Sequence, residues 1–385
     1  MKTYHIYTRA ADLPESWDKL PVNDIFLKRS FLSALEASSP TNITTYFLGV
    51  FLSDVLVGIA IIQRVEMYVD DIFRTTPNTW FKRCGKWIIS KIVRGNALIV
   101  GNLMHTGQHG LYFNPKQLTQ DQFLETVSTA LNGLTQQIKM THNKSVRIIG
   151  FKDYFENDPI HSSTGFFRRE KLYKTQVQPN MIFAVNSAWS VPQDYVDSFR
   201  KKYRNRYKIA LKKSGNIARR ELSLDSIRAL KDTIHTLYTN VSDNAGVNSF
   251  KLSDNHFIQL KLALGEQFKM YGYFIDSELV GFYTLILNDE VLETYFLGYN
   301  KTYQYAHQMY LNMLFDMVAF GIVNHYKSIV FARTAMEIKS SVGALPKDMY
   351  LYVKHTNQII GNVILKLVVK YANPVKSWKE RHPFS

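Results

Sequence analysis

An internal repeat constrains the fold of this chain more than any other feature of its sequence. The octapeptide Phe51–Gly58 matches Phe274–Gly281 in its apolar, turn-forming and glycine positions. Chance explains one such match easily. Further segments then pair in the same order along the chain: Ala97–Gly101 with Thr294–Gly298, Thr119–Lys139 with Ala306–Val323, and 142–145 with 325–328. A constant order of matched segments favours a duplication.

Each copy predicts the same elements, namely strand, turn, strand, strand, helix and strand. The clearest part is a three-stranded meander in the second copy, in which β-branched and aromatic runs alternate with turn formers. Its strands are expected at Met270–Ile275, Leu279–Leu287 and Val291–Gly298. We therefore expect an α/β fold built from mixed (α+β) sheets, in two tandem domains that span residues 1–175 and 176–385.

Two basic segments stand out against this pattern. The first copy carries an insertion near residues 67–94, in which tryptophans mix with Lys and Arg. Such a segment can lie on a membrane surface or pack as an ordinary helix. The second is a basic helix expected at 196–214. There Phe199, Tyr203, Tyr207 and Leu211 recur at every fourth position, which predicts one buried side surrounded by cations.

The composition narrows the class of protein. A net charge of +15 favours an anionic partner such as nucleic acid, anionic lipid or a phosphorylated ligand. The chain has a single cysteine, Cys84, and its histidines do not form the His-Glu-x-x-His motif, so we expect no metal site. Because no signal peptide or membrane span is recognisable, we expect a cytoplasmic protein, with peripheral contact at the inner membrane face as an option.

Four motifs carry a resemblance to a known fold: Phe31–Glu36, Tyr203–Lys208, Phe296–Tyr299 and Arg333–Ala344. With the duplicated element order, they resemble tandem GNAT-fold (acyl-CoA N-acyltransferase fold) proteins, in particular the FemAB-like and BioF2-like N-acyltransferases. The resemblance implies an enzyme that transfers an acyl or aminoacyl group to an amine, in cell-envelope or small-metabolite biosynthesis. It also implies that two central parallel strands splay apart and hold one arm of a substrate.

The sequence departs from the GNAT pattern at the phosphate-binding loop. GNAT enzymes cradle the pyrophosphate of coenzyme A in a glycine-containing loop after the third meander strand. Here no glycine occurs between Gly298 and Gly321. The resemblance therefore leaves acyl-CoA or aminoacyl-tRNA as the donor and implies no other cofactor.

The resemblance and the alternation of the third strand indicate a catalytic set. Glu293 and Tyr295 are two residues apart, so both should face one side of the sheet. Glu293 is then the expected general base, with Tyr295 or Tyr299 as the acid. The alternative is a strand rim with a surface glutamate and core tyrosines.

Further candidates would bind substrate. Arg333 and Lys339 follow the last strand, where α/β sheets place ligands, and could hold a carboxylate or phosphate with Glu337 orienting one of them. The alternative is a set of surface salt bridges. Two smaller groups complete the substrate-binding candidates: Arg204, Arg206 and Lys208 as an anion clamp or a solvated helix face, and Asn248 and Phe250 on a loop over the cleft.

A second class of function remains open from the sequence. The chain could be a non-catalytic GNAT-fold protein that binds RNA or an anionic membrane through its basic segments. The missing phosphate loop favours this alternative, and the catalytic residues named above favour the enzyme.

Overall fold

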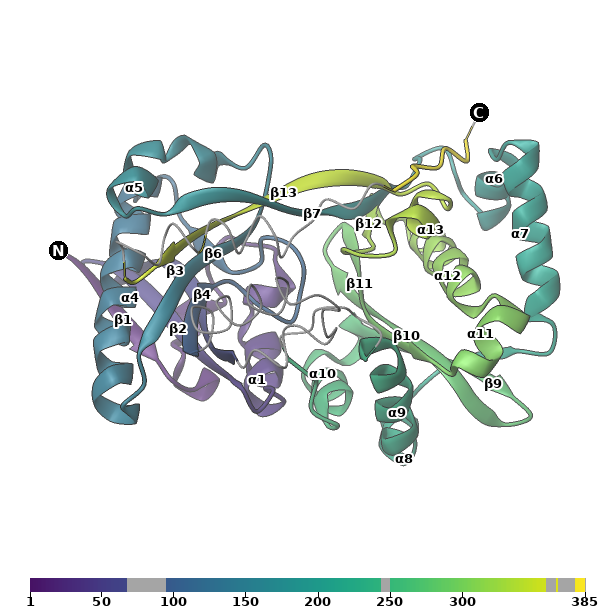
Figure 1. Cartoon of the computed structure of the whole chain (residues 1–385), viewed down its shortest axis with the longest axis horizontal. Coiled ribbons are helices and arrows are strands. Elements are labelled where there is room, and N and C mark those ends of the chain that lie inside the picture. Colours follow the sequence, from purple (N-terminus) through teal and green to yellow (C-terminus); the bar gives the residue numbers. More distant parts are fainter. Residues whose placement is uncertain (68–94, 244–249, 358–364, 366–377, 385) are drawn as a thin grey trace, which may run out of the picture. The chain divides into compact units, whose positions relative to one another are not determined.

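The computed structural model describes residues 1–67, 95–243, 250–357, 365 and 378–384 (Figure 1). The described residues form two compact units. Unit 1 takes those within Met1–Gln178, Gly246–Ser253 and Asp348–Val375, and unit 2 takes those within Pro179–Ala245, Asp254–Lys347 and Lys376–Ser385. The predicted insertion lies outside the described residues, between the end of one strand at Met67 and the start of the next at Gly95.

Unit 1 is built on a mixed sheet in the order β1-β2-β3-β4-β6-β13, with β5 paired to β3. Among the described strands of this unit, only β4 and β6 pair in parallel. The main helix, α4, begins with the predicted capping box at Thr119 and Gln122 and buries an apolar side that includes Phe123 and Leu131. The elements are β1 (Lys2–Tyr7), α1 (Arg29–Ala37), β2 (Ile43–Leu52), β3 (Val55–Met67), β4 (Gly95–Val100), β5 (Leu111–Phe113), α4 (Gln120–His142), β6 (Val146–Phe155), α5 (Thr164–Arg169) and β13 (Leu345–His355).

The strands of unit 2 follow the order β7-β12-β11-β10-β9-β8, and of the strands described there only β11 and β12 pair in parallel. The meander β9-β10-β11 matches the predicted strands to within a few residues. The elements are β7 (Tyr173–Ala184), α6 (Pro192–Asp197), α7 (Lys201–Ser214), β8 (Ala218–Glu221), α8 (Leu224–Ala229), α9 (Lys231–Ser242), α10 (His256–Leu264), β9 (Phe268–Ile275), β10 (Glu278–Asn288), β11 (Val291–Tyr299), α11 (Lys301–His307), α12 (Met309–Val323), β12 (Ser328–Val330) and α13 (Met336–Ser340).

The two units confirm the predicted duplication. In unit 1 the order β2-β3-β4-α4-β6 repeats as β9-β10-β11-α12-β12 in unit 2, with the same strand directions. The matched octapeptides also turn alike. Ser53 and Asp54 have φ values of 46° and 67°, and Asp276 and Ser277 have 46° and 70°. Two successive left-handed residues are the geometry of the tight hairpin that suits the twist of a sheet.

The strand that completes each sheet comes from the end of the other copy. β7 follows the first copy in the sequence, and its later part pairs antiparallel with β12 of unit 2. β13 ends the second copy and pairs antiparallel with β6 of unit 1 from Met349 to His355. The predicted boundary at 175/176 lies close to the observed one at 178/179, but it assigns β13 wholly to the second domain, whereas most of β13 belongs to unit 1.

In unit 2, helices cover both faces of the meander. The side chains of Leu292 and Ile329 pack with α12 in the main core of this unit. On the opposite face, α9 lies so close to β11 that Gly298 has no room for a side chain. A Cβ at this position would lie 2.5 Å from backbone atoms of both Leu237 and Tyr238.

We expect Gly298→Ala to destabilise unit 2 by about 1–3 kcal/mol, because backbone atoms of α9 cannot rotate away from the added methyl group. The measurement is chemical unfolding followed by circular dichroism. Gly165→Ala is the matched control, since a Cβ there would meet nothing within 4 Å. Equal stability of the two variants would contradict the close packing of α9 on β11.

Candidate functional site

The candidate site begins where the two parallel strands of unit 2 stop pairing. β11 and β12 pair at Val291 with Ser328, Leu292 with Ile329, and Glu293 with Val330. Among the described residues, no strand pairs with β11 beyond Glu293 on this side, although β11 continues to Tyr299. We call this point, where β11 and β12 stop pairing after Glu293 and Val330, the fork. The Thr294 hydroxyl donates to the Val330 carbonyl at 2.8 Å and holds the two strands together there. The sheet therefore opens at Glu293, as the resemblance implied.

A β-bulge follows directly on β11. Tyr283 pairs with Leu297 and Leu285 with Thr294, so that Tyr295 and Phe296 together face Thr284. The Thr284 hydroxyl holds the bulge by donating to the Phe296 carbonyl at 2.7 Å and accepting from the Phe296 N–H at 3.0 Å. Nothing in the alternation of the sequence signals this bulge.

The catalytic candidates divide between the two faces of the sheet. Glu293 is 2% exposed and lies on the face opposite Leu292 and α12. Tyr295 shares that face, where its hydroxyl lies 3.1 Å from His256 Nε2 on α10, and burial raises its pKa well above the usual range. Tyr299 contacts Tyr310 of α12 instead. The structure thus places Tyr295, but not Tyr299, on the side of Glu293.

A strained loop and a buried amine lie next to the fork. Immediately after β12, Ala332, Thr334 and Ala335 all have positive φ. Lys339 Nζ donates to the carbonyls of Ala332 at 3.3 Å and Arg333 at 2.6 Å. Lys339 is 5% exposed, and its burial lowers the pKa to about 7. Burial also lowers the pKa of Arg333, to about 10.

Glu337 does not orient Arg333 or Lys339. Its carboxylate is exposed and forms an ion pair with Arg381, which comes from the C-terminal segment 378–384. Arg206 lies near this pair, where burial and the charge of Arg381 lower its pKa. Glu337 thus follows the alternative of a surface salt bridge, with a partner that lies far along the sequence.

The three cations of the expected anion clamp are not brought together. Arg204 donates to the carbonyls of Asp197 at 2.6 Å and Phe199 at 3.0 Å, so it caps the end of α6. Arg206 is half-buried beside Glu337, and Lys208 is exposed. Leu211, expected on the buried side of the helix, is 55% exposed, and Ala210 is buried instead.

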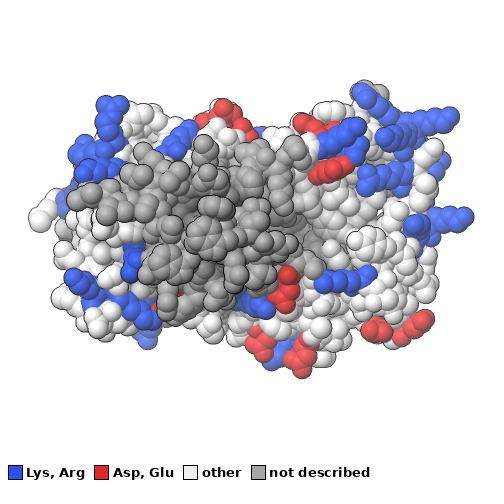
Figure 2. All heavy atoms as spheres, viewed as in Figure 1, with Lys and Arg blue, Asp and Glu red and all other residues white. Residues whose placement is uncertain are grey.

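The exposed face of α7 is nevertheless strongly basic. Figure 2 shows Lys and Arg gathered over the region where α7 lies in Figure 1. The exposed lysines of this helix are Lys201, Lys202, Lys208, Lys212 and Lys213. No acidic residue occurs in α7. Two exposed aliphatic side chains, Ile209 and Leu211, lie among these cations.

The two candidates on the loop over the cleft, Asn248 and Phe250, stand differently in the structure. Asn248 lies outside the described residues. Phe250 is half-buried against a small apolar cluster of unit 1 that includes Ile43 and Val65. Phe250 is therefore a packing residue of unit 1, which differs from its expected place over a cleft in the second domain.

Two polar features of the structure were not predicted from the sequence. In unit 2, Asn180 on β7 is fully buried, and neither polar atom of its side chain makes a hydrogen bond in the described structure. Val330 pairs with both Glu293 and Ile182, and Asn180 is two residues from Ile182, so Asn180 shares the face of Glu293. A lone asparagine in a strand gives no sequence signal of such a role.

The second missed feature is a histidine pair in unit 1. His109 Nδ1 lies 2.8 Å from a carboxylate oxygen of Asp24, and the rings of His105 and His109 are 4.9 Å apart. Burial alone would raise the pKa of Asp24, but the charge and hydrogen bond of His109 lower it. The spacing His105-x-x-x-His109 was a readable signal against the expectation of no metal site. Each imidazole could ligate a transition metal.

No sequence model of a protein family matches this chain, and no curated protein does. Solved structures do match its fold. One is a tandem GNAT protein from the clavulanic acid biosynthesis pathway, solved without AcCoA, with a TM-score of 0.53, 8% identity and coverage of 92% of this chain and 98% of that chain. FemX matches with a TM-score of 0.52, 9% identity and coverage of 96% and 100%.

A third match is a conserved protein of unknown function from Bacteroides thetaiotaomicron, with a TM-score of 0.50, 11% identity and coverage of 91% and 99%. Within the described residues, no helix is long and apolar enough to cross a membrane. The likeness extends over nearly the whole chain and includes both copies of the repeat. The protein therefore has the fold of two GNAT domains in tandem, as its sequence predicted.

Proposed function

We propose that unit 2 is an N-acyltransferase domain that moves an acyl or aminoacyl group to an amine. The observation that carries the proposal is the early end of the pairing between β11 and β12 at Glu293. An extended, amide-bearing arm of a substrate can take the place of the missing strand partner and pair with the backbone of β11. The likeness in fold to the tandem GNAT protein and FemX supports this class of reaction.

The residues beside the fork suit the two proton transfers of acyl transfer. With an aminoacyl ester as donor, the acceptor nitrogen attacks the carbonyl, and a C–N bond forms as the C–O bond to the leaving group breaks. Glu293 takes the proton that the nitrogen loses. Lys339 in its protonated form gives a proton to the departing oxygen. A pKa of about 7 populates both forms of this amine near neutral pH, which is the condition that favours general acid catalysis.

Asn180 supplies the remaining polar group on this face. Its side-chain amide offers two N–H donors and one carbonyl acceptor, and all are buried. A buried polar group without a partner is costly, so a ligand that satisfies it is favoured. We assign Asn180 to the recognition of an amide or carbonyl group in the substrate arm.

The start of α12 bears on the identity of the donor. In GNAT enzymes the helix N-terminus after the splayed strand binds pyrophosphate. Here Gln304 Oε1 already accepts from the Tyr310 N–H at 2.9 Å, and the short helix α11 replaces the glycine loop. The chain therefore lacks the glycine loop that binds the pyrophosphate of coenzyme A in GNAT enzymes. Aminoacyl-tRNA fits better, because the exposed lysines of α7 in the same unit can contact an RNA backbone.

One observation favours the alternative of a non-catalytic protein that binds an anionic membrane. Ile209 and Leu211 are 52% and 55% exposed among the lysines of α7, and exposed aliphatic groups between cations suit a lipid surface. Binding to anionic vesicles without any transfer activity would favour this function over the enzyme.

We expect Glu293→Gln to lower the rate of transfer by about 100-fold or more, because it removes the general base. The assay follows a labelled amino acid from charged tRNA to a pool of amine acceptors, with acyl-CoA as a parallel donor. Glu290→Gln is the matched control, since Glu290 lies in the exposed turn before β11. Equal rates for the two variants, with equal thermal midpoints, would remove Glu293 from the mechanism.

We expect Lys339→Met to stabilise the fold most at or below pH 7. The pKa of Lys339 is about 7 when folded and 10.5 as its ordinary value, so the unfolded chain binds more protons between these limits. The free energy of unfolding of the wild type should therefore rise by about 1.4 kcal/mol relative to that of Lys339→Met for each pH unit above 7 in this interval. Urea unfolding at pH 7, 8 and 9 measures the difference. Lys347→Met, at an exposed site, should show no such trend.

We expect replacement of Lys201, Lys208 and Lys212 by Ala to weaken tRNA binding and to reduce the slope of log K against log salt by roughly 2, as loss of three phosphate contacts requires. The measurement is filter binding across a salt series, with anionic vesicles as a parallel arm. The control replaces three exposed lysines of unit 1: Lys19, Lys116 and Lys139. Equal slopes for both triple variants would place the anionic partner elsewhere.

A further inference from the structure

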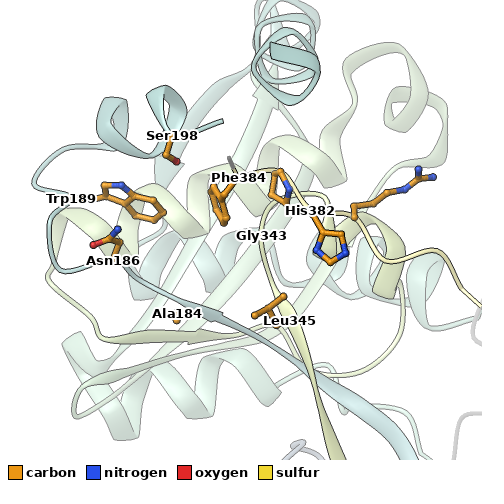
Figure 3. Close-up of a pocket in the computed structure, with 10 residues that line it drawn as sticks. Ala184, Asn186, Trp189, Ser198, Gly343, Leu345, His382 and Phe384 are labelled. Atoms are coloured by element: carbon orange, nitrogen blue, oxygen red, sulfur yellow. The ribbon is translucent and has the colours of Figure 1, made fainter. Parts of the chain in front are cut away.

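Unit 2 contains a pocket with a volume of 510 Å³ that the proposed transfer reaction does not use (Figure 3). Drug-sized ligands occupy pockets of roughly 300–1,000 Å³. None of the lining residues is among those assigned to the reaction. They are Ala184, Asn186, Trp189, Ser198, Gly343, Leu345, Arg381, His382, Pro383 and Phe384.

The C-terminal segment forms one wall of this pocket and is held in place by its backbone. The Arg200 N–H donates to the Pro383 carbonyl at 2.9 Å, and the Arg381 N–H donates to the Ser340 hydroxyl at 3.0 Å. Gly343 has a φ of 105°, and a Cβ there would lie 2.5 Å from the ring of Phe384. Glycine is therefore required for the segment to approach so closely.

Aromatic rings line the pocket from both sides, Trp189 from one and Phe384 of the C-terminal segment from the other. Figure 3 shows Trp189 and Asn186 on one side, Phe384 and His382 on the other, and Ala184 and Leu345 below them. The rings of Trp189 and Phe384 are 5.7 Å apart at 50°, which makes an apolar corner. Leu345 is 53% exposed and adds an aliphatic edge.

Several polar groups of the lining are N–H donors, whereas the Ser198 hydroxyl already donates to the Tyr195 carbonyl at 2.6 Å. No described lining residue is Asp or Glu. His382 and Arg381 are both present, and the guanidinium of Arg381 is paired with Glu337, which lies outside the lining. Asn186 Oδ1 accepts from the Ala188 N–H at 2.9 Å, which leaves the amide N–H groups of Asn186 directed to other partners. In the described part of the chain, the indole N–H of Trp189 makes no hydrogen bond with protein. A ligand with acceptor oxygens and negative charge complements this lining.

We propose that this pocket binds a small aromatic carboxylate. The flat apolar body lies in the corner of Trp189 and Phe384, where stacking and burial stabilise it. The carboxylate accepts from the N–H donors of the lining, namely the amide of Asn186, the indole of Trp189 and the ring of His382, beside the Arg381–Glu337 pair. This site is independent of the transfer reaction, since it stands on a cavity lined by other residues of unit 2.

The experiment is equilibrium dialysis of 2-naphthoate against the full chain, with 2-naphthylmethylamine as the cationic analogue. We expect saturable binding of one naphthoate per chain and at least tenfold weaker binding of the amine. Leu345→Glu places a carboxylate at the exposed edge of the pocket and should weaken naphthoate binding at least tenfold. Val323→Glu is the matched control, because Val323 is equally exposed, at 55%, but does not line the pocket.

A second variant tests the apolar corner. Trp189→Ala should also weaken naphthoate binding at least tenfold, and Trp189→Phe should retain most of it, with circular dichroism confirming that both variants fold. The proposal is overturned if naphthoate does not saturate at one site, if the amine binds equally well, or if Leu345→Glu and Val323→Glu bind naphthoate alike. Loss of transfer activity in Glu293→Gln would leave this binding unchanged, so the two proposals fail separately.

Discussion

The end of parallel pairing at Glu293 is the constraint on which the candidate site depends. A sheet rarely leaves strand backbone without a partner inside a fold, because unpaired N–H and C=O groups are costly. Unit 2 fixes the opening with the Thr294 hydroxyl on one strand and a bulge held by Thr284 on the next. Glu293 lies where this pairing stops, and Lys339 bonds the carbonyls of Ala332 and Arg333 in the loop directly after β12. The chemical groups of the site are thus set by where one strand pair stops.

The two copies share the same order of strands and helices but differ in the segment that follows the third meander strand. In unit 1, β4 pairs with β6 along its whole length up to Val100, so no comparable fork forms. The loop that follows carries the histidine pair with Asp24. In unit 2 the corresponding segment is α11, and Gln304 caps the next helix. Duplication followed by change in the segment after the third meander strand explains why one unit presents a fork and the other a histidine cluster.

Local features were predictable from the sequence, and features that join distant segments were not. Alternation and turn residues located the meander because both depend on neighbouring residues. The constant order of the matched segments identified the tandem fold. Periodicity placed Leu211 on the buried side of α7, but only tertiary packing decides that Ala210 takes this place. Glu337 has its partner in the C-terminal segment, and Phe250 packs in the other unit. Sequence spacing carries no information about such partners.

The reciprocal placement of β7 and β13 has a consequence for biosynthesis. As the nascent chain leaves the ribosome, the N-terminal copy is complete in sequence long before β13 is made. Until then β6 forms an open sheet edge, the kind of surface that recruits other chains and promotes aggregation. The strand β13 thus acts as the closing element of the first domain, and the gene cannot be cut at the repeat boundary into two self-sufficient halves.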